Sequence, residues 1–289
     1  MIPMSENNAS IADIFGVGTL DLIEPSFADL PDNRFTALLM ECDGDQGRLL
    51  IDQESDPIAV AVHSMDGRWI AGCCHLRRPT ASLIAFFEDM GGDIYQEERQ
   101  AWEEAVREYY SLRIAAEVTP AFEDLNPERT ALVQELLMEN LGPGNGQTCL
   151  DFCCGSGLGS AVLRGMGYRI LSCDIDLSLL SLGFSTGRLV PRETMHIDAT
   201  LAHHYIGRAG IGLGLMFGEI NEFNADTWEI LTRELVMLTD RCLITVGKEA
   251  EANRILAWAQ ACDRTVEISE NTRDPIYDRW VCTIKGESG

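Results

Sequence analysis

The chain has very little lysine. Only Lys248 and Lys285 are lysines among its 22 basic residues, and 46 acidic residues bring the formal net charge to −24. A surface this acidic repels phosphate backbones and anionic membranes. The composition therefore argues against a broad nucleic-acid or membrane interface and predicts a solvated acidic surface.

The sequence also lacks the marks of export and of membrane insertion. No apolar run approaches the roughly 20 residues of a membrane-spanning helix, and the first residues, MIPMSENNAS, are polar, unlike a secretory signal. We therefore expect a cytoplasmic protein whose ten cysteines are reduced thiols. No two of them have the CxxC spacing that marks many zinc and redox sites.

Two clusters of metal-binding residue types each allow two interpretations. Cys73, Cys74 and His75 stand together in the apolar run RWIAGCCHLR. Buried packing is favoured over metal binding there, because buried cysteine behaves as a small hydrophobic residue. His203 and His204 lie in ATLAHHYIG, where the sequence offers neither a cysteine nor a carboxylate to complete a site. A surface position is favoured for this pair.

The N-terminal part of the sequence predicts a small α+β domain. Four strand-like runs (FTALLMEC, GRLLIDQ, IAVAVHS and RWIAGCCHL) are separated by the turn sequences CDGDQG, ESDP and MDG, which is typical of an antiparallel meander. From about Thr80 the apolar period becomes helical. Helices are predicted in TASLIAFFEDM, in QEERQAWEEAVREYYSLRIAAEV and in PERTALVQELLMENL, the last ending at Gly142.

Five further residues also allow two interpretations. Tyr109 and Tyr110 precede the glycine-rich segment, where a lid over a ligand is one possibility and core packing is the favoured one. Arg188, Arg192 and Arg208 would attract an anionic substrate, although scattered surface charge is the simpler explanation.

The remainder of the chain is organised around the stretch CLDFCCGSGLGS, from Cys149 to Ser160. A short apolar run with one acid, Asp151, reads as a buried strand. It breaks into three alternate glycines, which let the backbone approach a ligand closely, and helical spacing follows. A strand, a tight glycine turn and a helix present free backbone N–H groups to a crevice.

Strand and helix patterns alternate after the glycine turn. Short apolar runs (RILSC, TMHI, GIGLGLMF, CLITV, TVEIS and RWVCTIK) are separated by helical patterns, except that the last two are joined by the loop ENTRDPIYD. Alternation predicts a doubly wound, mainly parallel sheet of seven strands with helices on both faces. The missing helix predicts that the last strand is antiparallel.

The glycine pattern separates two kinds of nucleotide-binding protein. A dinucleotide-binding fingerprint requires GxGxxG, but here Gly159 falls one position early and Ser160 stands in the third slot. An acid on the strand followed by GxGxG resembles the first motif of the class I S-adenosylmethionine-dependent methyltransferases. Asp174 and Asp198-Ala199 end the next two strands, where that family also places acids. The resemblance covers roughly residues 141 to 285.

The resemblance implies S-adenosylmethionine as cofactor and a role for each matching residue. Asp174 would hold the ribose hydroxyls, Asp198 would meet the adenine amino group, and Asp151 would face the methionine end. Glu219, after the fourth strand, is the candidate catalytic residue on the acceptor side. The residues expected to bind the cofactor are Asp151, Cys153, Gly155, Gly157, Asp174, Ile175, Asp198, Ala199 and Phe217.

Cys153 departs from the family pattern, which usually has glycine there, so its side chain would narrow the approach to the cofactor. We predict an N-terminal accessory domain over residues 1–125, for acceptor recognition or as a lid, and a methyltransferase domain over residues 126–289. The acceptor is expected to be a small molecule or a protein, not nucleic acid. An NAD(P)-dependent oxidoreductase and a non-catalytic S-adenosylmethionine-binding protein are the alternatives.

Overall fold

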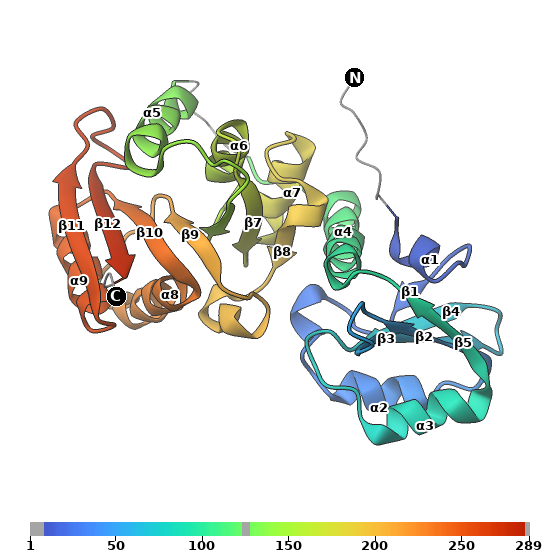
Figure 1. Ribbon diagram of the computed structural model, residues 1–289. Coiled ribbons are helices and arrows are strands. Elements are labelled where there is room, and N and C mark those ends of the chain that lie inside the picture. Colours follow the sequence, from blue (N-terminus) through green and yellow to red (C-terminus); the bar gives the residue numbers. More distant parts are fainter. Residues whose placement is uncertain (1–8, 123–127, 287–289) are drawn as a thin grey trace. The chain divides into compact units, whose positions relative to one another are not determined.

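The chain forms two compact units, Met1–Leu112 and Arg113–Gly289 (Figure 1). The computed structural model describes residues 9–122 and 128–286. The boundary predicted between residues 125 and 126 therefore lies outside the described residues.

The first unit contains a five-stranded sheet and several helices. Its elements are α1 (Ile11–Ile14), β1 (Asp21–Leu22), a 3₁₀ turn η1 (Phe27–Asp29), α2 (Arg34–Met40), β2 (Gly44–Ile51), β3 (Pro57–Ser64), β4 (Trp69–Cys73), α3 (Ala81–Met90), β5 (Gly92–Gln96) and α4 (Arg99–Glu117). The strand order is β1-β4-β3-β2-β5. Helix α4 begins in this unit and continues past its boundary.

The predicted antiparallel meander is confirmed for β2, β3 and β4. Helices α2 and α3 lie along one face of this sheet (Figure 1), and Leu39 and Phe87 pack with Val60 and Val62 beneath them. Tyr110 of α4 packs edge-on against Phe27 and is buried within the same unit. The favoured interpretation of Tyr110, core packing, agrees with this position.

One prediction for the first unit was wrong, and one strand was missed. Residues 35–40 form helix α2 and not a strand, because Phe35 and Leu39, four apart, bury one helical face. The uniform apolar run FTALLM contained no period that separates the two structures. Strand β5 was not predicted, because it is a mostly exposed edge strand beside β2 and carries no buried alternation.

The second unit contains the glycine turn. Its elements are α5 (Arg129–Leu141), β6 (Thr148–Phe152), α6 (Leu158–Gly165), β7 (Arg169–Asp174), α7 (Leu177–Ser185), η2 (Pro191–Glu193), β8 (Thr194–His196), η3 (Ala199–His204), β9 (Ala209–Gly214), α8 (Ala225–Leu238), β10 (Thr239–Val246), α9 (Glu249–Gln260), β11 (Arg264–Glu270) and β12 (Trp280–Gly286).

The seven strands of the second unit form one sheet in the order β11-β12-β10-β9-β6-β7-β8. Strands β6 to β10 pair in parallel, whereas β12 is antiparallel to both of its neighbours, β10 and β11. The predicted fold class, a mainly parallel seven-stranded sheet with an antiparallel last strand, is confirmed. The carboxyl ends of β6, β7 and β8 lie side by side at one edge.

Helices cover both faces of this sheet. On one face, Leu136 and Leu137 of α5 and Leu163 of α6 form a core with Leu213 and Leu243 of the strands. Helices α8 and α9 pack on the other face (Figure 1). The strands are thus buried on both sides, which explains their continuous apolar sequences.

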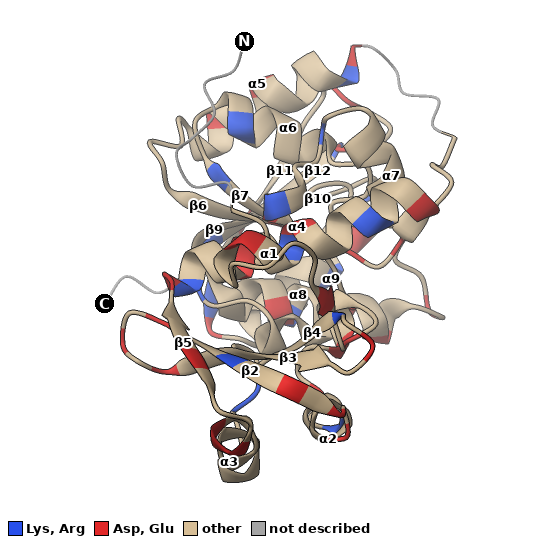
Figure 2. Ribbon diagram, turned by 90° about the vertical axis from the view of Figure 1, so that its right-hand side faces the viewer, with Lys and Arg blue, Asp and Glu red and all other residues tan. Residues whose placement is uncertain are grey.

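Acidic residues occur on helices, strands and loops of both units (Figure 2), in keeping with the expected acidic surface. None of the helices in residues 9–122 and 128–286 is long and apolar enough to cross a membrane.

Candidate functional site

The glycine turn links β6 to α6 through a run of left-handed backbone. Cys153, Gly155 and Gly157 have φ angles of 55°, 54° and 81°. A Cβ at position 157 would lie 2.5 Å from Leu189, so this glycine is required for packing, whereas a Cβ at position 155 would make only an ordinary contact with Leu179 at 3.9 Å. The turn therefore leaves Gly155 free to approach a ligand.

Asp151 lies beneath this turn, on β6, and is almost fully buried. Its Oδ2 accepts a hydrogen bond of 2.5 Å from the Ser160 hydroxyl, which lies 2.7 Å from the Ser172 hydroxyl. A Cβ on Gly159 would come within 3.1 Å of the same oxygen and 2.8 Å of Leu213. The third glycine thus makes room for the acid on the strand.

Burial raises the pKa of Asp151 to about 7, although the Ser160 hydroxyl and N–H lower it. Desolvation penalises the charged form and hydrogen bonds to that form favour it. Asp151 therefore gains a proton near neutral pH unless a cation occupies the space beside it.

Asp174 ends β7 and braces the turn. Its Oδ2 accepts from the Gly155 N–H at 2.7 Å and its Oδ1 from the Asp176 N–H at 2.8 Å. Asp176 in turn caps α7 by accepting from Ser178 and Leu179. Burial raises the pKa of Asp174, while the two N–H donors lower it.

Asp198 follows β8 and caps the 3₁₀ turn η3. Its Oδ1 accepts from the N–H and the hydroxyl of Thr200, at 2.9 and 2.7 Å. Asp151, Asp174 and Asp198 therefore stand at or beyond the carboxyl ends of three adjacent parallel strands. All three line one cavity of about 920 Å³.

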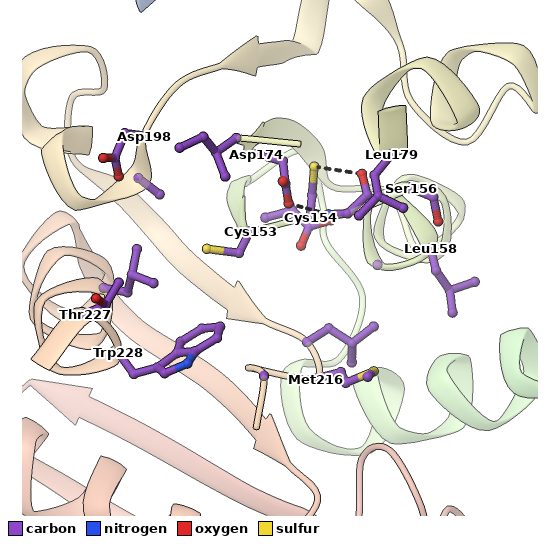
Figure 3. A pocket seen from close by; sticks show the side chains of 18 of the residues that line it. Cys153, Cys154, Ser156, Leu158, Asp174, Leu179, Asp198, Met216, Thr227 and Trp228 are labelled. Carbon is purple, nitrogen blue, oxygen red and sulfur yellow. Dashed lines mark hydrogen bonds between the residues drawn. The ribbon is translucent and has the colours of Figure 1, made fainter. Parts of the chain in front are cut away.

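The opposite wall of this cavity follows β9. Met216 and Gly218 have φ angles of 52° and 39°, which turns the chain sharply after the strand. A Cβ on Gly218 would lie 2.0 Å from the Trp228 ring, so glycine admits the indole at this point. Phe217 is buried and packs on Trp228, with ring centroids 5.0 Å apart. Figure 3 shows Met216 and Trp228 across the cavity from Asp174 and Asp198.

Most of the residues expected to bind the cofactor line the cavity. They are Asp151, Cys153, Gly155, Asp174, Ile175, Asp198 and Ala199. Gly157 and Phe217 do not line it; they pack beneath the surface and shape the two turns. Glu219 also lies outside the lining, with its side chain 87% exposed and a carboxylate oxygen 3.6 Å from Lys248 Nζ.

Several lining residues were not predicted from the sequence. They come from α5, from the start of α8 and from the β11–β12 loop, and include Arg129, Thr227, Trp228, Ile230, Leu231 and Tyr277. They share no local motif with the glycine turn. They are brought to the cavity by the strand order, which places the carboxyl ends of β9 and β10 and the start of β12 on one side of β6.

The cysteine cluster of the first unit is buried, as favoured from the sequence. Cys73 and Cys74 are at most 5% exposed, and burial raises the pKa of both thiols. His75 Nδ1 accepts from the Trp102 indole N–H at 3.3 Å. Burial and nearby arginines lower the pKa of His75 to about 3, so its ring is neutral.

His203 has a partner that the local sequence did not show. Glu234 on α8 lies 2.9 Å from its Nδ1, and the rings of His203 and His204 contact each other at a tilt of 42°, with centroids 4.0 Å apart. Both histidines are exposed, as expected. Among the described residues no group of three or more histidine, cysteine or carboxylate side chains is arranged to hold a metal ion.

No family model matches the chain. No curated protein matches it either.

Several solved structures are similar to part of the chain at low identity. Magnesium protoporphyrin IX methyltransferase from Synechocystis, with bound S-adenosylmethionine, is 15% identical over 64% of this chain and 97% of its own, with a TM-score of 0.43. The ribosomal protein L11 methylase of Lactobacillus delbrueckii subsp. bulgaricus is 14% identical over 60% and 91%, with a TM-score of 0.43. An rRNA methylase of Streptococcus thermophilus is 11% identical over 58% and 100%, with a TM-score of 0.38.

By their names, these proteins are methyltransferases that act on a porphyrin, a protein and an RNA.

Proposed function

We propose that the chain is an S-adenosylmethionine-dependent methyltransferase whose site is the cavity of the second unit. One observation carries the proposal: three carboxylates, Asp151, Asp174 and Asp198, stand at the ends of adjacent strands β6, β7 and β8 around one cavity. Crevices outside the carboxyl ends of parallel strands are where open α/β sheets bind ligands.

The carboxylates retain capacity for the cofactor's polar groups. An ionised aspartate has about four lone-pair sites, and Asp174 accepts from the N–H groups of Gly155 and Asp176 and from the backbone of Ile175. The remaining capacity suits a ribose hydroxyl. At Asp198 the described residues occupy only Oδ1, which leaves Oδ2 for an amino group such as that of adenine.

The size and lining of the cavity fit a nucleoside with an amino-acid tail. Its volume of about 920 Å³ lies at the upper end of the roughly 300–1,000 Å³ that is usual for small-molecule sites. Ile175, Leu179 and Leu158 supply apolar lining beside the acids. Asp151, nearest the glycine turn, would stabilise the positive charge of the methionine end.

Once bound, the cofactor supplies an activated methyl group, so the protein has mainly to position the acceptor. The wall formed by Met216, Gly218 and Trp228 faces the acids across the cavity and is the proposed acceptor side. A small molecule or a protein is the proposed acceptor, because the net charge of −24 disfavours nucleic acid. The N-terminal unit is proposed to serve acceptor recognition or as a lid.

Glu219, three residues beyond Met216, is still the proposed general base. A base is needed only if the acceptor must lose a proton, and such a base contributes about 10²–10⁴-fold to the rate. If Glu219 has this role, Glu219→Gln lowers kcat at least about 100-fold with unchanged cofactor affinity. An unchanged kcat would remove Glu219 from the mechanism.

Calorimetric titration tests the proposal directly. S-adenosylmethionine is expected to bind, whereas NAD⁺ and NADP⁺ are not. The reverse result would favour an oxidoreductase, since Asp174 alone suits the ribose of either cofactor. Transfer of labelled methyl groups to a cell extract then separates an enzyme from a protein that only binds the cofactor.

A further inference from the structure

Arg129 is the one cation among the described residues that line the cavity. It is the first residue of α5, and its side chain is 14% exposed. In a chain with 46 acidic residues, a largely buried guanidinium facing a ligand cavity calls for a physical explanation.

The guanidinium is held from two sides. Its Nη2 donates to Asp278 Oδ2 at 3.3 Å, and its Cζ lies 4.7 Å from the centroid of the Tyr277 ring. Asp278 is itself buried and accepts from the Thr245 hydroxyl at 2.6 Å. These contacts fix the plane of the guanidinium and engage only its Nη2 donors.

Arg129 retains unused hydrogen-bonding capacity. Of its five N–H donors, only those on Nη2 have partners among the described residues, namely Asp278 and the sulfur of Met216. Its Nε is buried and has no acceptor there. The Arg129 guanidinium is planar, is held by the Asp278 carboxylate and still has free N–H donors. Such a group suits a second anion, either a carboxylate or a phosphate.

The position of Arg129 along the sheet assigns that anion to the acceptor. The three acids lie over β6, β7 and β8, whereas the partners of Arg129 come from the turn after β9 and from the loop before β12, where Asp278 is bound in turn by Thr245 of β10. Neighbouring strands are about 4.8 Å apart. The guanidinium therefore lies beyond the proposed methyl donor, on the side of Met216 and Trp228.

The lining around Arg129 is mainly apolar, with Thr227 as a neutral polar member. Met216, Trp228, Ile230 and Tyr277 stand on this side of the cavity. Apolar walls with one convergent charge select an apolar body that carries one charged group. The acidic surface of the protein would repel an anion, so a dedicated cation is needed to bind one.

We propose that the methyl acceptor is a molecule with an apolar body and one anionic group, and that Arg129 binds this group. The inference rests on the proposed function, since it assigns the acceptor half of the same cavity. It makes Arg129 a residue that determines acceptor specificity.

Three aromatic probes test the proposal in protein saturated with S-adenosylhomocysteine. Phenylacetate and phenyl phosphate carry the two candidate anions, and phenylacetamide is their neutral counterpart. Titration followed by saturation-transfer NMR is expected to show at least one anion binding ten times more tightly than the amide. The stronger of the two anions identifies the acceptor's group.

Variants assign the preference to Arg129. Arg129→Gln is expected to remove the preference for the anion, and Arg129→Lys to retain part of it. Combining Arg129→Gln with Asp278→Asn avoids an unpaired buried carboxylate, so that a folding defect is not mistaken for lost binding. Arg208→Gln, an exposed arginine at the other edge of the sheet, is the matched control and should change nothing.

Two results would overturn the inference. One is the absence of any anion preference in the wild-type protein, or its survival in Arg129→Gln. The other is a selective loss of cofactor affinity: if Arg129→Gln weakens S-adenosylhomocysteine tenfold but leaves methylthioadenosine unchanged, Arg129 binds the cofactor's carboxylate instead. Failure of the wild-type protein to bind S-adenosylhomocysteine would sink the proposed function itself and is recognised before any probe is added.

Discussion

The two ends of the parallel strands, here called the carboxyl edge and the amino edge of the seven-stranded sheet, carry side chains of opposite charge. At the carboxyl ends of the strands, three acids surround the cavity. At the amino ends, a second hollow of about 830 Å³ is lined by Arg208, Arg241, Arg264 and Lys285, with Asp240 as the one acid among its described lining residues. Acidic side chains thus gather at the carboxyl ends of the parallel strands, and basic side chains at the amino ends.

The backbone explains part of this separation. In a parallel α/β sheet the helix N-termini, with free N–H groups, lie at the carboxyl edge, and the C-termini, with free carbonyls, lie at the amino edge. Arg241 donates to the Leu141 carbonyl at the end of α5, and Arg264 to the Val236 carbonyl near the end of α8. Asp174 conversely accepts from N–H groups of the glycine turn and of the turn before α7.

The two edges differ in how many hydrogen-bond donors and acceptors are left unused by these contacts. The guanidiniums of Arg241 and Arg264 bond to backbone carbonyls, whereas the three acids and Arg129 keep free acceptor or donor sites toward their cavity. We infer that the amino edge stabilises the unit and that the carboxyl edge binds ligands. Substitutions at the two edges should therefore separate stability from binding.

The largest effect is expected for Asp174→Ala. Its carboxylate braces Gly155 and would bind the ribose, and hydrogen bonds to charged groups contribute about 1.5–3 kcal/mol each. Calorimetry should show at least about a 100-fold loss of S-adenosylmethionine affinity, with an unchanged circular dichroism spectrum. Asp240→Ala at the amino edge should bind normally, and equal losses in the two variants would contradict the comparison.

A stability effect of the carboxyl edge is expected for Gly159→Ala. The new Cβ would press on Leu213 and on the Asp151 carboxylate, and overpacking of this kind costs about 1–3 kcal/mol. Denaturant unfolding measures the loss. Gly165→Ala, in the same helix with open space around it, is the control. A similar loss in both variants would show that helix α6, not the contact with Asp151, is responsible.

The pH dependence of binding should reflect Asp151. Its pKa of about 7 in the folded protein exceeds the roughly 3.9 of an unfolded aspartate. The resulting stabilisation is therefore complete below pH 4 and is lost as the pH rises through about 7. A bound cation favours the ionised form, so S-adenosylmethionine affinity should rise toward pH 8, by at most about tenfold per pH unit. Asp151→Asn should abolish this slope in calorimetric titrations.

The smallest effects are expected at the amino edge. Arg264→Gln removes hydrogen bonds to the Val236 and Thr239 carbonyls, which should lower the unfolding free energy by about 1–2 kcal/mol. Arg208→Gln breaks an exposed pair with Asp240, which is worth less than about 1 kcal/mol. Neither should alter cofactor affinity. A tenfold loss of affinity in either variant would show that the two edges are coupled.

The sequence predicted the framework of the second unit because its signals are local. The apolar run before the glycines, the alternation of strands and helices, and an acid at or after each of three strand ends are all patterns within a few residues. Helix α2 and strand β5 were missed for the converse reason. The packing of Phe35 and the pairing of β5 with β2 depend on residues that are distant in the sequence. A short stretch of sequence does not reveal such contacts.

The acceptor side of the site was missed for a related reason. Arg129 and Asp278 are 149 positions apart and meet because β11 ends at the carboxyl edge, where the loop that carries Asp278 leads into the antiparallel β12 beside β10. No spacing rule joins them. The same holds for Glu234, which reaches His203 from another helix.

The place of β12 also constrains the order in which the sheet can assemble. Strand β11 precedes β12 in the chain but pairs with β12 alone, which in turn pairs with β10. Strand β11 therefore joins the sheet only through β12, either after β12 has docked on β10 or together with it as a hairpin. A weakened β12 would release two strands together, along with the Tyr277 and Asp278 loop between them.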